Sequence, residues 1–314
     1  MLTEVDVHNY RSIYEASVSL SPFTLLIGAN GTGKSNFLKL LKDASNTGLV
    51  KDDRSYGSMA FPSIKHYAFA DDAQLIVIRN DKNQSYEIRE NSREQSLLPE
   101  LRNVKIFSLE PKKAGMVESI EPNPKIQENG EGVVRVLDAL KTGDREDLFL
   151  LIEKTFKQYI PDIKKLSFTS AADGKRLQIR EKHLPRPIPG SLLSEGTQLA
   201  LMLITLLQQE HKPSLVCIED IDRGLHPRLF QSIVELCFDL SKSEHGVQII
   251  ATTHNPYLVD EFKDHEDAVI IVEKENGQTT FTTLSERLER LDPEEEPLGS
   301  LWYSGFVGGV PKRA

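Results

Sequence analysis

The chain has 314 residues, enough for one large domain or two smaller ones, and its 39% hydrophobic and 27% charged residues are typical of a globular protein. A net charge of −9 argues against nucleic-acid binding over the whole surface, but it does not exclude a local basic groove. No apolar run reaches the roughly 20 residues of a membrane span, and the N-terminus lacks the pattern of a signal peptide. Cys217 and Cys237 lie in apolar segments, so we expect buried thiols in a reducing compartment. Together these features predict a cytoplasmic location and no membrane association.

The N-terminal third predicts strands around a glycine-rich loop. Residues 2–21 alternate apolar and polar side chains over two runs, as half-buried antiparallel strands do. The apolar run FTLLI then enters the glycines, and residues 34–45 have the apolar spacing of a helix. Beyond it we expect a loop at residues 46–60, a hairpin of strands at residues 73–81 and 84–90, and another strand within residues 103–111.

The middle of the chain changes character twice. Residues 110–132 carry proline and glycine without a period, which predicts a long connection. Two helical patterns follow, at residues 132–140 and 145–159. Residues 164–182 then predict a strand pair with Asp173-Gly174 at its turn, before a proline-broken linker.

The segment Gly28-Ala29-Asn30-Gly31-Thr32-Gly33-Lys34-Ser35 matches the phosphate-binding pattern G-x-x-x-x-G-K-[ST] in full. Glycines let the backbone turn its N–H groups toward phosphate oxygens, and the following helix N-terminus favours an anion. In this pattern Lys34 supplies charge to the β and γ phosphates, and Ser35 binds Mg²⁺. The sequence therefore predicts a nucleotide-phosphate site with Mg²⁺.

Two later strands are each followed by polar residues. The buried run Leu215–Ile218 precedes Glu219 and Asp220, and the run Val247–Ala251 leads to His254. At the carboxyl ends of strands in an open α/β sheet, such side chains face a ligand crevice. There one carboxylate can hold Mg²⁺ through water, and the next can orient or deprotonate the attacking water.

A third feature opens the most apolar helix of the chain. Ser194 is a predicted N-cap, Gly196 and Thr197 fall in the first turn, and the apolar face begins at Leu199. A capped core helix explains the apolar part fully. The small polar residues at its start are not explained by burial.

These motifs, in this order, resemble the ATP-binding-cassette ATPases, and in particular the SMC, Rad50 and RecF group together with the OLD-type ATPases. LLSEGTQ resembles the signature motif, IEDIDRGLHP the Walker B segment, ATTHNP the switch histidine, and VHNYRSI the opening strand, which carries an arginine beside the nucleotide. The resemblance implies an α/β fold: a P-loop ATPase head with a mixed central sheet, an antiparallel β subdomain and a helical lobe. Within one head over residues 1–314 we expect a β-rich lobe with the P-loop (1–110), a connecting and helical lobe with the signature motif (111–200), a Walker B and switch-histidine core (201–275) and a C-terminal tail (276–314).

The resemblance also implies a mechanism, in which two heads sandwich two ATP molecules and hydrolysis separates them. Asp220 would be the catalytic carboxylate, aided by Glu219, and His254 would contact the γ phosphate. Ser35 and Glu219 would hold the metal, together with a Q-loop glutamine, for which Gln127 is the first choice and Gln74 the second. The nucleotide-binding residues would be Arg11, Asn30, Gly31, Thr32, Gly33, Lys34, Ser35, Asn36, Ser194, Glu195 and Gly196.

The sequence departs from the family pattern in three places. The family places Asp before Glu after the Walker B strand, whereas this chain has Glu219 then Asp220. The shorter Asp220 implies either slow hydrolysis or recruitment of Asp222, and we expect a slow ATPase that a partner or a substrate stimulates. No stretch of the chain has the heptads of a long coiled coil, and the residues after His254 leave no room for the nuclease domain of OLD proteins. Trp302, Tyr303 and Phe306 lie among C-terminal glycines, where they either cap the chain's own core or form a contact surface.

The leading hypothesis is an ATP-dependent, dimerising switch subunit of a prokaryotic DNA-repair or anti-phage complex. It would form a homodimer through the ATP sandwich and act with a separate effector or nuclease subunit, and binding to DNA stays open. One alternative is the ATPase subunit of a transporter. Another is a nucleotide-dependent scaffold with negligible hydrolysis, which the order of Glu219 and Asp220 favours.

Overall fold

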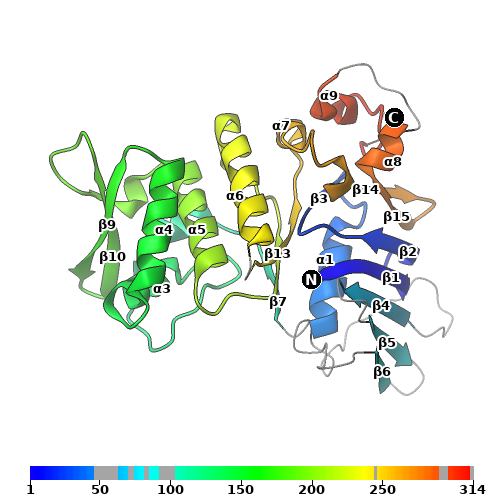
Figure 1. Cartoon of the computed structure of the whole chain (residues 1–314), viewed down its shortest axis with the longest axis horizontal. Coiled ribbons are helices and arrows are strands. Elements are labelled where there is room, and N and C mark those ends of the chain that lie inside the picture. The colour runs from blue at the N-terminus through cyan, green and yellow to red at the C-terminus, as the bar shows by residue number, and fades with distance from the viewer. Residues whose placement is uncertain are drawn as a thin grey trace. The chain divides into compact units, whose positions relative to one another are not determined.

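A computed structural model describes residues 1–45, 63–69, 74–80, 85–91, 103–243, 246–289 and 296–311. Its contacts divide the chain into two compact units (Figure 1). Unit 1 comprises Met1–Ile106, Pro213–Asp220 and Ser241–Ala314, and unit 2 comprises Phe107–Lys212 and Ile221–Leu240. Both units are therefore assembled from separate stretches of sequence. The four consecutive segments expected from the motifs stay a prediction, because compactness alone does not test them.

A six-stranded mixed sheet forms the centre of unit 1. Its order is β15 (Gln278–Thr283), β14 (Val269–Glu275), β3 (Phe23–Ile27), β13 (Gln248–Thr252), β12 (Leu215–Ile218) and β7 (Val104–Phe107). Strands β14, β3, β13 and β12 are parallel, and β15 is antiparallel to β14. Every residue of β3, β13 and β12 is buried, which explains why these strands are continuous apolar runs.

The second sheet of unit 1 is antiparallel throughout. Its order is β2 (Ile13–Ser19), β1 (Leu2–Tyr10), β4 (Ser63–Phe69), β5 (Gln74–Asn80) and β6 (Ser85–Asn91). The two alternating strands predicted at the N-terminus and the predicted hairpin of β5 and β6 are confirmed. Strand β4 was not expected from the sequence, and the loop predicted for residues 46–60 lies outside the described residues.

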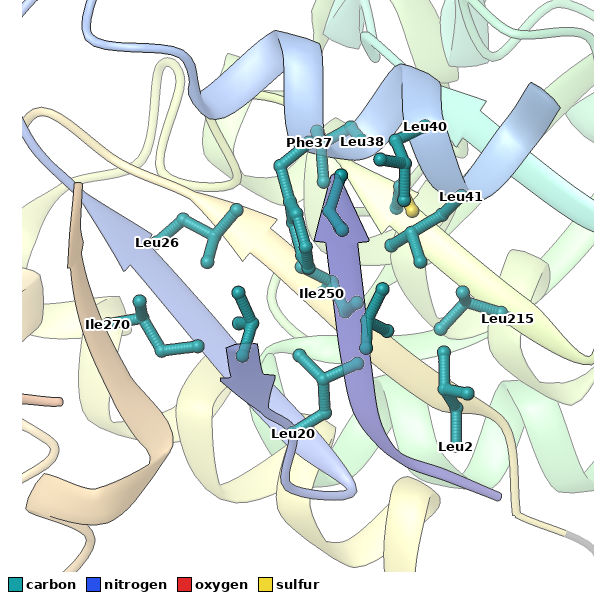
Figure 2. Packing of buried hydrophobic residues seen from close by; sticks show 14 of the residues in the cluster. Leu2, Leu20, Leu26, Phe37, Leu38, Leu40, Leu41, Leu215, Ile250 and Ile270 are labelled. Carbon is teal, nitrogen blue, oxygen red and sulfur yellow. The ribbon is translucent and has the colours of Figure 1, made fainter. Parts of the chain in front are cut away.

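Helix α1 (Lys34–Ser45) packs in a hydrophobic core that contains residues of both sheets of unit 1 (Figure 2). Its side chains Phe37, Leu38, Leu40 and Leu41 are fully buried in one cluster that also contains residues of β1 and of the central sheet. Burying side chains of this size contributes roughly 1.5–3 kcal/mol each. The core therefore fixes the helix whose N-terminus carries the glycine-rich loop.

The C-terminal part of unit 1 contributes to the central sheet. Strand β15 pairs with β14 over six residues, and α8 (Leu284–Glu289) follows it. Helix α9 (Leu298–Tyr303) packs on α7 (Pro256–Asp260), with the Gly299 N–H donating to Asp260 Oδ1 at 2.7 Å. The aromatic residues divide: Trp302 is buried and caps the chain's own core, whereas Tyr303 is 80% and Phe306 50% exposed.

Unit 2 is a helical layer against a small antiparallel sheet. The helices are α3 (Val133–Thr142), α4 (Glu146–Tyr159), α5 (Glu195–Gln208) and α6 (Phe230–Lys242) as far as Leu240. The sheet has the order β11 (Ile188–Pro189), β10 (Gly174–Glu181) and β8 (Val117–Glu118), with β9 (Ile163–Ala171) also on β10. The predicted helices and the β9–β10 hairpin are confirmed, and short 3-10 turns lie at Pro111–Gly115, Gly190–Leu192 and Pro227–Leu229.

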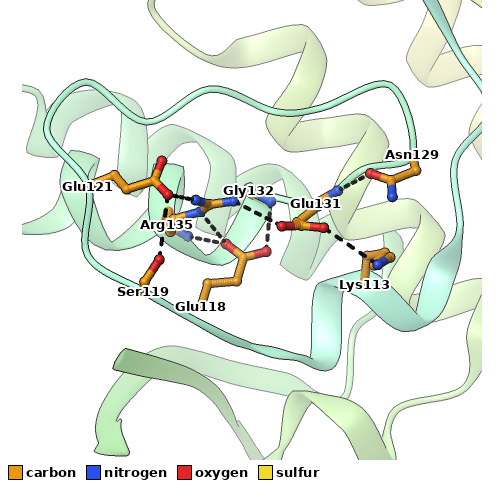
Figure 3. Close-up of polar contacts among 8 residues, drawn as sticks. All are labelled: Lys113, Glu118, Ser119, Glu121, Asn129, Glu131, Gly132 and Arg135. Carbon is orange, nitrogen blue, oxygen red and sulfur yellow. Dashed lines mark hydrogen bonds and ion pairs between the residues drawn. The ribbon is translucent and has the colours of Figure 1, made fainter. Parts of the chain in front are cut away.

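The connection predicted over residues 110–132 contains more structure than its composition suggests (Figure 3). The buried carboxylate of Glu118, from β8, accepts the N–H groups of Gly132 at 2.7 Å and Arg135 at 2.9 Å. It therefore caps the N-terminus of α3 and lies 3.3 Å from the Arg135 guanidinium. Glu121 and Glu131 also pair with Arg135, so this network ties both ends of the connection to the helix.

Candidate functional site

The glycine-rich loop lies between the C-terminal end of β3 and the first turn of α1. Gly31 and Gly33 have φ of +77° and +122°, a region that other residues rarely adopt. A Cβ atom at Gly33 would also lie 2.3 Å from Thr279 Oγ1, so a larger residue does not fit there. The glycines of the motif are thus required by backbone conformation and by close packing.

Lys34 is almost completely buried inside this loop. Its Nζ donates to the carbonyl oxygens of Gly28 at 2.7 Å and Ala29 at 2.9 Å. Burial lowers the pKa of the Lys34 ammonium to about 8, and the negative charge of Asp220 opposes that shift. A phosphate group at this loop would supply the counter-charge that a buried ammonium requires.

A cavity of about 330 Å³ opens beside the loop, entirely within unit 1. It brings together the loop with the ends of β12 and β13, as the sequence predicts for parallel strands. Ser35 Oγ donates to Glu219 Oε1 at 2.8 Å, which joins the two motifs directly. The cavity is lined by Asn30, Gly31, Gly33, Lys34, Ser35, Asn36, Glu219, Asp220, Thr252 and His254.

The two adjacent carboxylates face different partners. Glu219 faces Ser35, whereas Asp220 lies with its Oδ1 4.0 Å from His254 Nε2. Asp220 has φ of +50°, and its N–H donates to Thr252 Oγ1 at 3.0 Å. Asp is one of the few residues that tolerate this left-handed conformation, and the bend separates the directions of the two side chains.

Among the predicted nucleotide-binding residues of unit 1, Thr32 and Arg11 do not line the cavity. Thr32 is buried, and its Oγ1 donates to the Ala29 carbonyl at 3.0 Å, so only its backbone can serve a ligand. Arg11 lies in the turn between β1 and β2 with its guanidinium over the Tyr10 ring, 5.4 Å from the centroid. Gln74 begins β5, and the structure describes its backbone alone.

The signature residues and Gln127 belong to unit 2. Ser194 is the N-cap of α5, as predicted, and its Oγ accepts the Thr197 N–H at 3.2 Å. Glu195 pairs with Lys112 at 3.4 Å, and Gly196 lies in the first turn of the helix. Gln127 is exposed in the connection before α3, and its binding to metal stays a prediction.

Sequence reasoning missed three residues around the loop. Thr252 lines the cavity, and it follows the strand that the sequence did predict. Thr279 contacts the loop from β15, and Ser12 contacts Thr279 from the turn after β1. Nothing in the local sequence marks the hydroxyls of Thr279 and Ser12, because they approach the loop only through the pairing of distant strands.

The donor set fits a nucleotide with a divalent cation. Mg²⁺ prefers oxygen ligands, and the Ser35 hydroxyl and the Glu219 carboxylate supply two within hydrogen-bond distance of each other. The loop supplies backbone N–H groups and a buried ammonium for phosphate oxygens. Among the described helices, none combines the length and apolar character needed to cross a bilayer.

A family model described as "AAA domain, putative AbiEii toxin, Type IV TA system" matches residues 77–260, which is more than half of the chain. The matched region contains the signature helix, both carboxylates and His254, while the phosphate loop precedes it. Among curated proteins, the Old nuclease of Escherichia phage P2 is 25% identical over 190 residues, which cover 55% of this chain. The matched region is only 30% of the length of that relative.

Solved structures of SMC heads share the fold. An SMC head bound to the C-terminal winged-helix domain of ScpA superposes with a TM-score of 0.62 at 13% identity, covering 92% of this chain and 99% of that one. The SMC head domain from Thermotoga maritima gives a TM-score of 0.56 at 15% identity, covering 90% and 98%. An SMC head with an extended coiled coil, bound to the C-terminal domain of ScpA from Pyrococcus furiosus, has a TM-score of 0.56 at 13% identity. That match covers 93% of this chain and 98% of the other.

Proposed function

The chain belongs to this AAA-domain family as a P-loop ATPase of the SMC, Rad50 and OLD-like branch, and from that premise we propose that it is an ATP-dependent, dimerising switch subunit. The observation that carries the ATPase part of the proposal is the hydrogen bond of 2.8 Å between Ser35 and Glu219. It joins the helix end of the phosphate loop to the carboxyl end of β12, which is the arrangement that metal-assisted phosphoryl transfer requires.

Each group of the cavity has a role in this proposal. Backbone N–H groups of residues 31–36 and the Lys34 ammonium hold the β and γ phosphates. Ser35 and Glu219 would hold Mg²⁺, which would neutralise charge on the phosphate oxygens. Asp220 orients the attacking water and accepts its proton, while His254 donates a hydrogen bond to the γ phosphate.

Hydrolysis is expected to be slow in the isolated protein. The side chain of Asp220 is one methylene shorter than a glutamate at the same position, so it reaches less far toward a water molecule. A partner can correct this geometry by moving the strand end or by recruiting Asp222. A scaffold with negligible hydrolysis is the second candidate, and this same short side chain favours it.

The signature helix gives the switch its second half. Ser194 caps α5 with a hydroxyl at the positive end of a 14-residue helix, which suits a γ phosphate. We place this helix against the nucleotide of a second copy, so that ATP holds two chains together and hydrolysis releases them. A separate effector or nuclease would read the state of the dimer, in a DNA-repair or anti-phage complex.

Native mass measurement with a non-hydrolysable ATP analogue and Mg²⁺ tests the proposal. We expect a dimer or a larger assembly with the analogue and a smaller species without it. Ser194→Arg should abolish the assembly and leave the affinity for the analogue within about threefold of wild type, since the substitution lies outside the cavity. Unchanged mass on addition of the analogue contradicts the dimer, and rapid hydrolysis by the isolated chain contradicts the slow switch.

A further inference from the structure

We propose that Thr279, in strand β15, is a positioning residue of the phosphate loop. This inference rests on the nucleotide-binding part of the proposed function and is independent of dimer formation. Thr279 lies outside the region matched by the family model and far from the loop in sequence. Its side chain is only 1% exposed and packs directly against the loop.

The contacts of Thr279 form a directed chain of hydrogen bonds. Its Oγ1 lies 2.7 Å from the Thr32 carbonyl oxygen and 2.7 Å from Ser12 Oγ. A threonine hydroxyl has one proton, and a carbonyl oxygen can only accept. The Thr279 hydroxyl therefore donates to the Thr32 carbonyl, and the Ser12 hydroxyl donates to Thr279 Oγ1. Asn36 Nδ2 then donates to Ser12 Oγ at 2.8 Å, and the backbone N–H of Thr279 donates to the Ser12 carbonyl at 2.7 Å.

The bond to Thr32 determines where the next N–H group points. In a trans peptide the C=O and the following N–H are directed to opposite sides of the same plane, and every described peptide is trans. When Thr279 holds the Thr32 carbonyl on the side of β15, the Gly33 N–H must face away from β15. Gly33 lines the cavity, so this N–H is a phosphate donor whose direction is set in advance.

Other carbonyls of the loop are held in the same manner. Lys34 donates to the Gly28 and Ala29 carbonyls, and the Thr32 hydroxyl also donates to Ala29. These donors come from the loop and its own helix, whereas Thr279 comes from a distant strand. Thr279 therefore links the shape of the loop to the β14–β15 hairpin and to the turn that contains Ser12.

Replacement of the hydroxyl gives a direct test. Thr279→Val keeps the shape of the side chain and leaves the Thr32 carbonyl without its donor, so the Kd for a fluorescent ATP analogue with Mg²⁺ should rise about five- to tenfold. Thr279→Ser restores the hydroxyl and should return the Kd to within about twofold of wild type. Thr280→Val is the matched control, because Thr280 is the exposed neighbour on the same strand and should leave the Kd unchanged.

Hydrogen exchange of the Gly33 amide separates positioning from plain stability. Nucleotide should protect this amide strongly in wild type and Thr279→Ser, and weakly in Thr279→Val. If Thr279→Val lowers the melting temperature but keeps the wild-type Kd and Gly33 protection, the residue is structural and the inference is overturned. That result would concern Thr279 alone and would not contradict dimer formation. Failure of the proposed dimer would appear instead as an unchanged mass on addition of the analogue, and the Kd values of the Thr279 variants could still be compared.

Discussion

At the scale of single residues, two side chains that are adjacent in the sequence have different surroundings in the site. Glu219 and Asp220 are neighbours, yet one faces the Ser35 hydroxyl and the other faces His254. Burial of Lys34 disfavours its charged form and so lowers the pKa of its ammonium group. These environments assign different roles to the residues, and each role can be tested by removing one charge.

Lys34→Met should abolish nucleotide binding without unfolding the protein. Methionine keeps most of the length of the side chain, and the substitution removes a buried charge together with two hydrogen bonds to loop carbonyls. Because these effects oppose each other, we expect the unfolding free energy to change by less than about 1 kcal/mol. The affinity for ATP should fall at least about 100-fold by calorimetry. Lys39→Met, on the exposed side of the same helix, is the control.

Asp220→Asn should stop hydrolysis and preserve ATP binding. Asparagine tolerates a φ of +50° as aspartate does, so the backbone bend stays while the proton acceptor is lost. Phosphate release should slow about 100-fold or more, with the Kd for ATP within about threefold of wild type. The comparison with Asp222→Asn is decisive: if that change stops hydrolysis and Asp220→Asn does not, Asp222 is the proton acceptor.

At the scale of secondary-structure elements, two helices of unit 2 begin with polar caps that serve different ends. The N-terminus of α5 is capped by its own Ser194, whose hydroxyl stays at the surface. The N-terminus of α3 is capped by Glu118, a buried residue of β8 that Arg135 neutralises (Figure 3). A buried, fully paired cap indicates a structural role, whereas an exposed one can meet a ligand.

Ser194→Asp should separate capping from anion binding at α5. Aspartate caps helices as well as serine does, so the stability of the protein should change by less than about 0.5 kcal/mol. Its carboxylate would repel the γ phosphate of a second copy, and we expect the ATP-dependent assembly to be lost in native mass spectra. Ser194→Asn, a neutral cap of the same size as aspartate, is the control and should retain assembly. Equal assembly by both variants would show that Ser194 is only a cap.

Glu118→Gln should destabilise unit 2. The amide cannot balance the charge of Arg135, and it accepts hydrogen bonds from the helix N–H groups more weakly. Glu121 and Glu131 still neutralise Arg135, so we expect a loss of about 1–3 kcal/mol in urea denaturation, with faster hydrogen exchange at the start of α3. Glu121→Gln changes the more exposed partner and should cost less than about 1 kcal/mol.

At the scale of the whole molecule, the chain builds two units by leaving and re-entering each of them. It passes from unit 1 to unit 2 after Ile106, returns for β12, leaves again at Ile221 and returns at Ser241. The phosphate loop, both carboxylates and His254 belong to unit 1, and the signature residues belong to unit 2. Each unit also contains one fully buried cysteine, Cys217 in unit 1 and Cys237 in unit 2.

These cysteines should report the opening of each unit separately. Burial raises the pKa of both thiols, that of Cys237 to about 12, so the reactive thiolate stays scarce in the native protein at pH 9, whereas unfolded cysteine ionises near pH 8.5. Labelling of the native chain should therefore rise little between pH 7 and 9. In mild urea, ATP with Mg²⁺ should slow the labelling of Cys217, two residues before Glu219, more than that of Cys237. Equal protection in peptide mass spectra would contradict separate opening.

The sequence by itself determined the order of the motifs, the strands that carry them and the capped helix α5, because these depend on local periodicity and on residue types with few alternative uses. It also predicted that Glu219 and Asp220 would face a ligand crevice at the carboxyl end of a buried strand, and the resemblance to known ATPases implied that Ser35 and Glu219 share a metal ion. It did not reveal that β14 and β15 belong to the central sheet, that β8 supplies the cap of α3, or that Trp302 is buried while Tyr303 is exposed.

Only the tertiary structure decided those points, because each depends on which distant segments pair. Thr279 illustrates the physical reason. Its hydroxyl is unremarkable in a run of threonines, and it becomes a partner of the phosphate loop only when β15 completes the sheet beside β14 and β3. Local sequence specifies which groups can donate a hydrogen bond. The pairing of strands far apart in the chain decides which of these groups meets the loop.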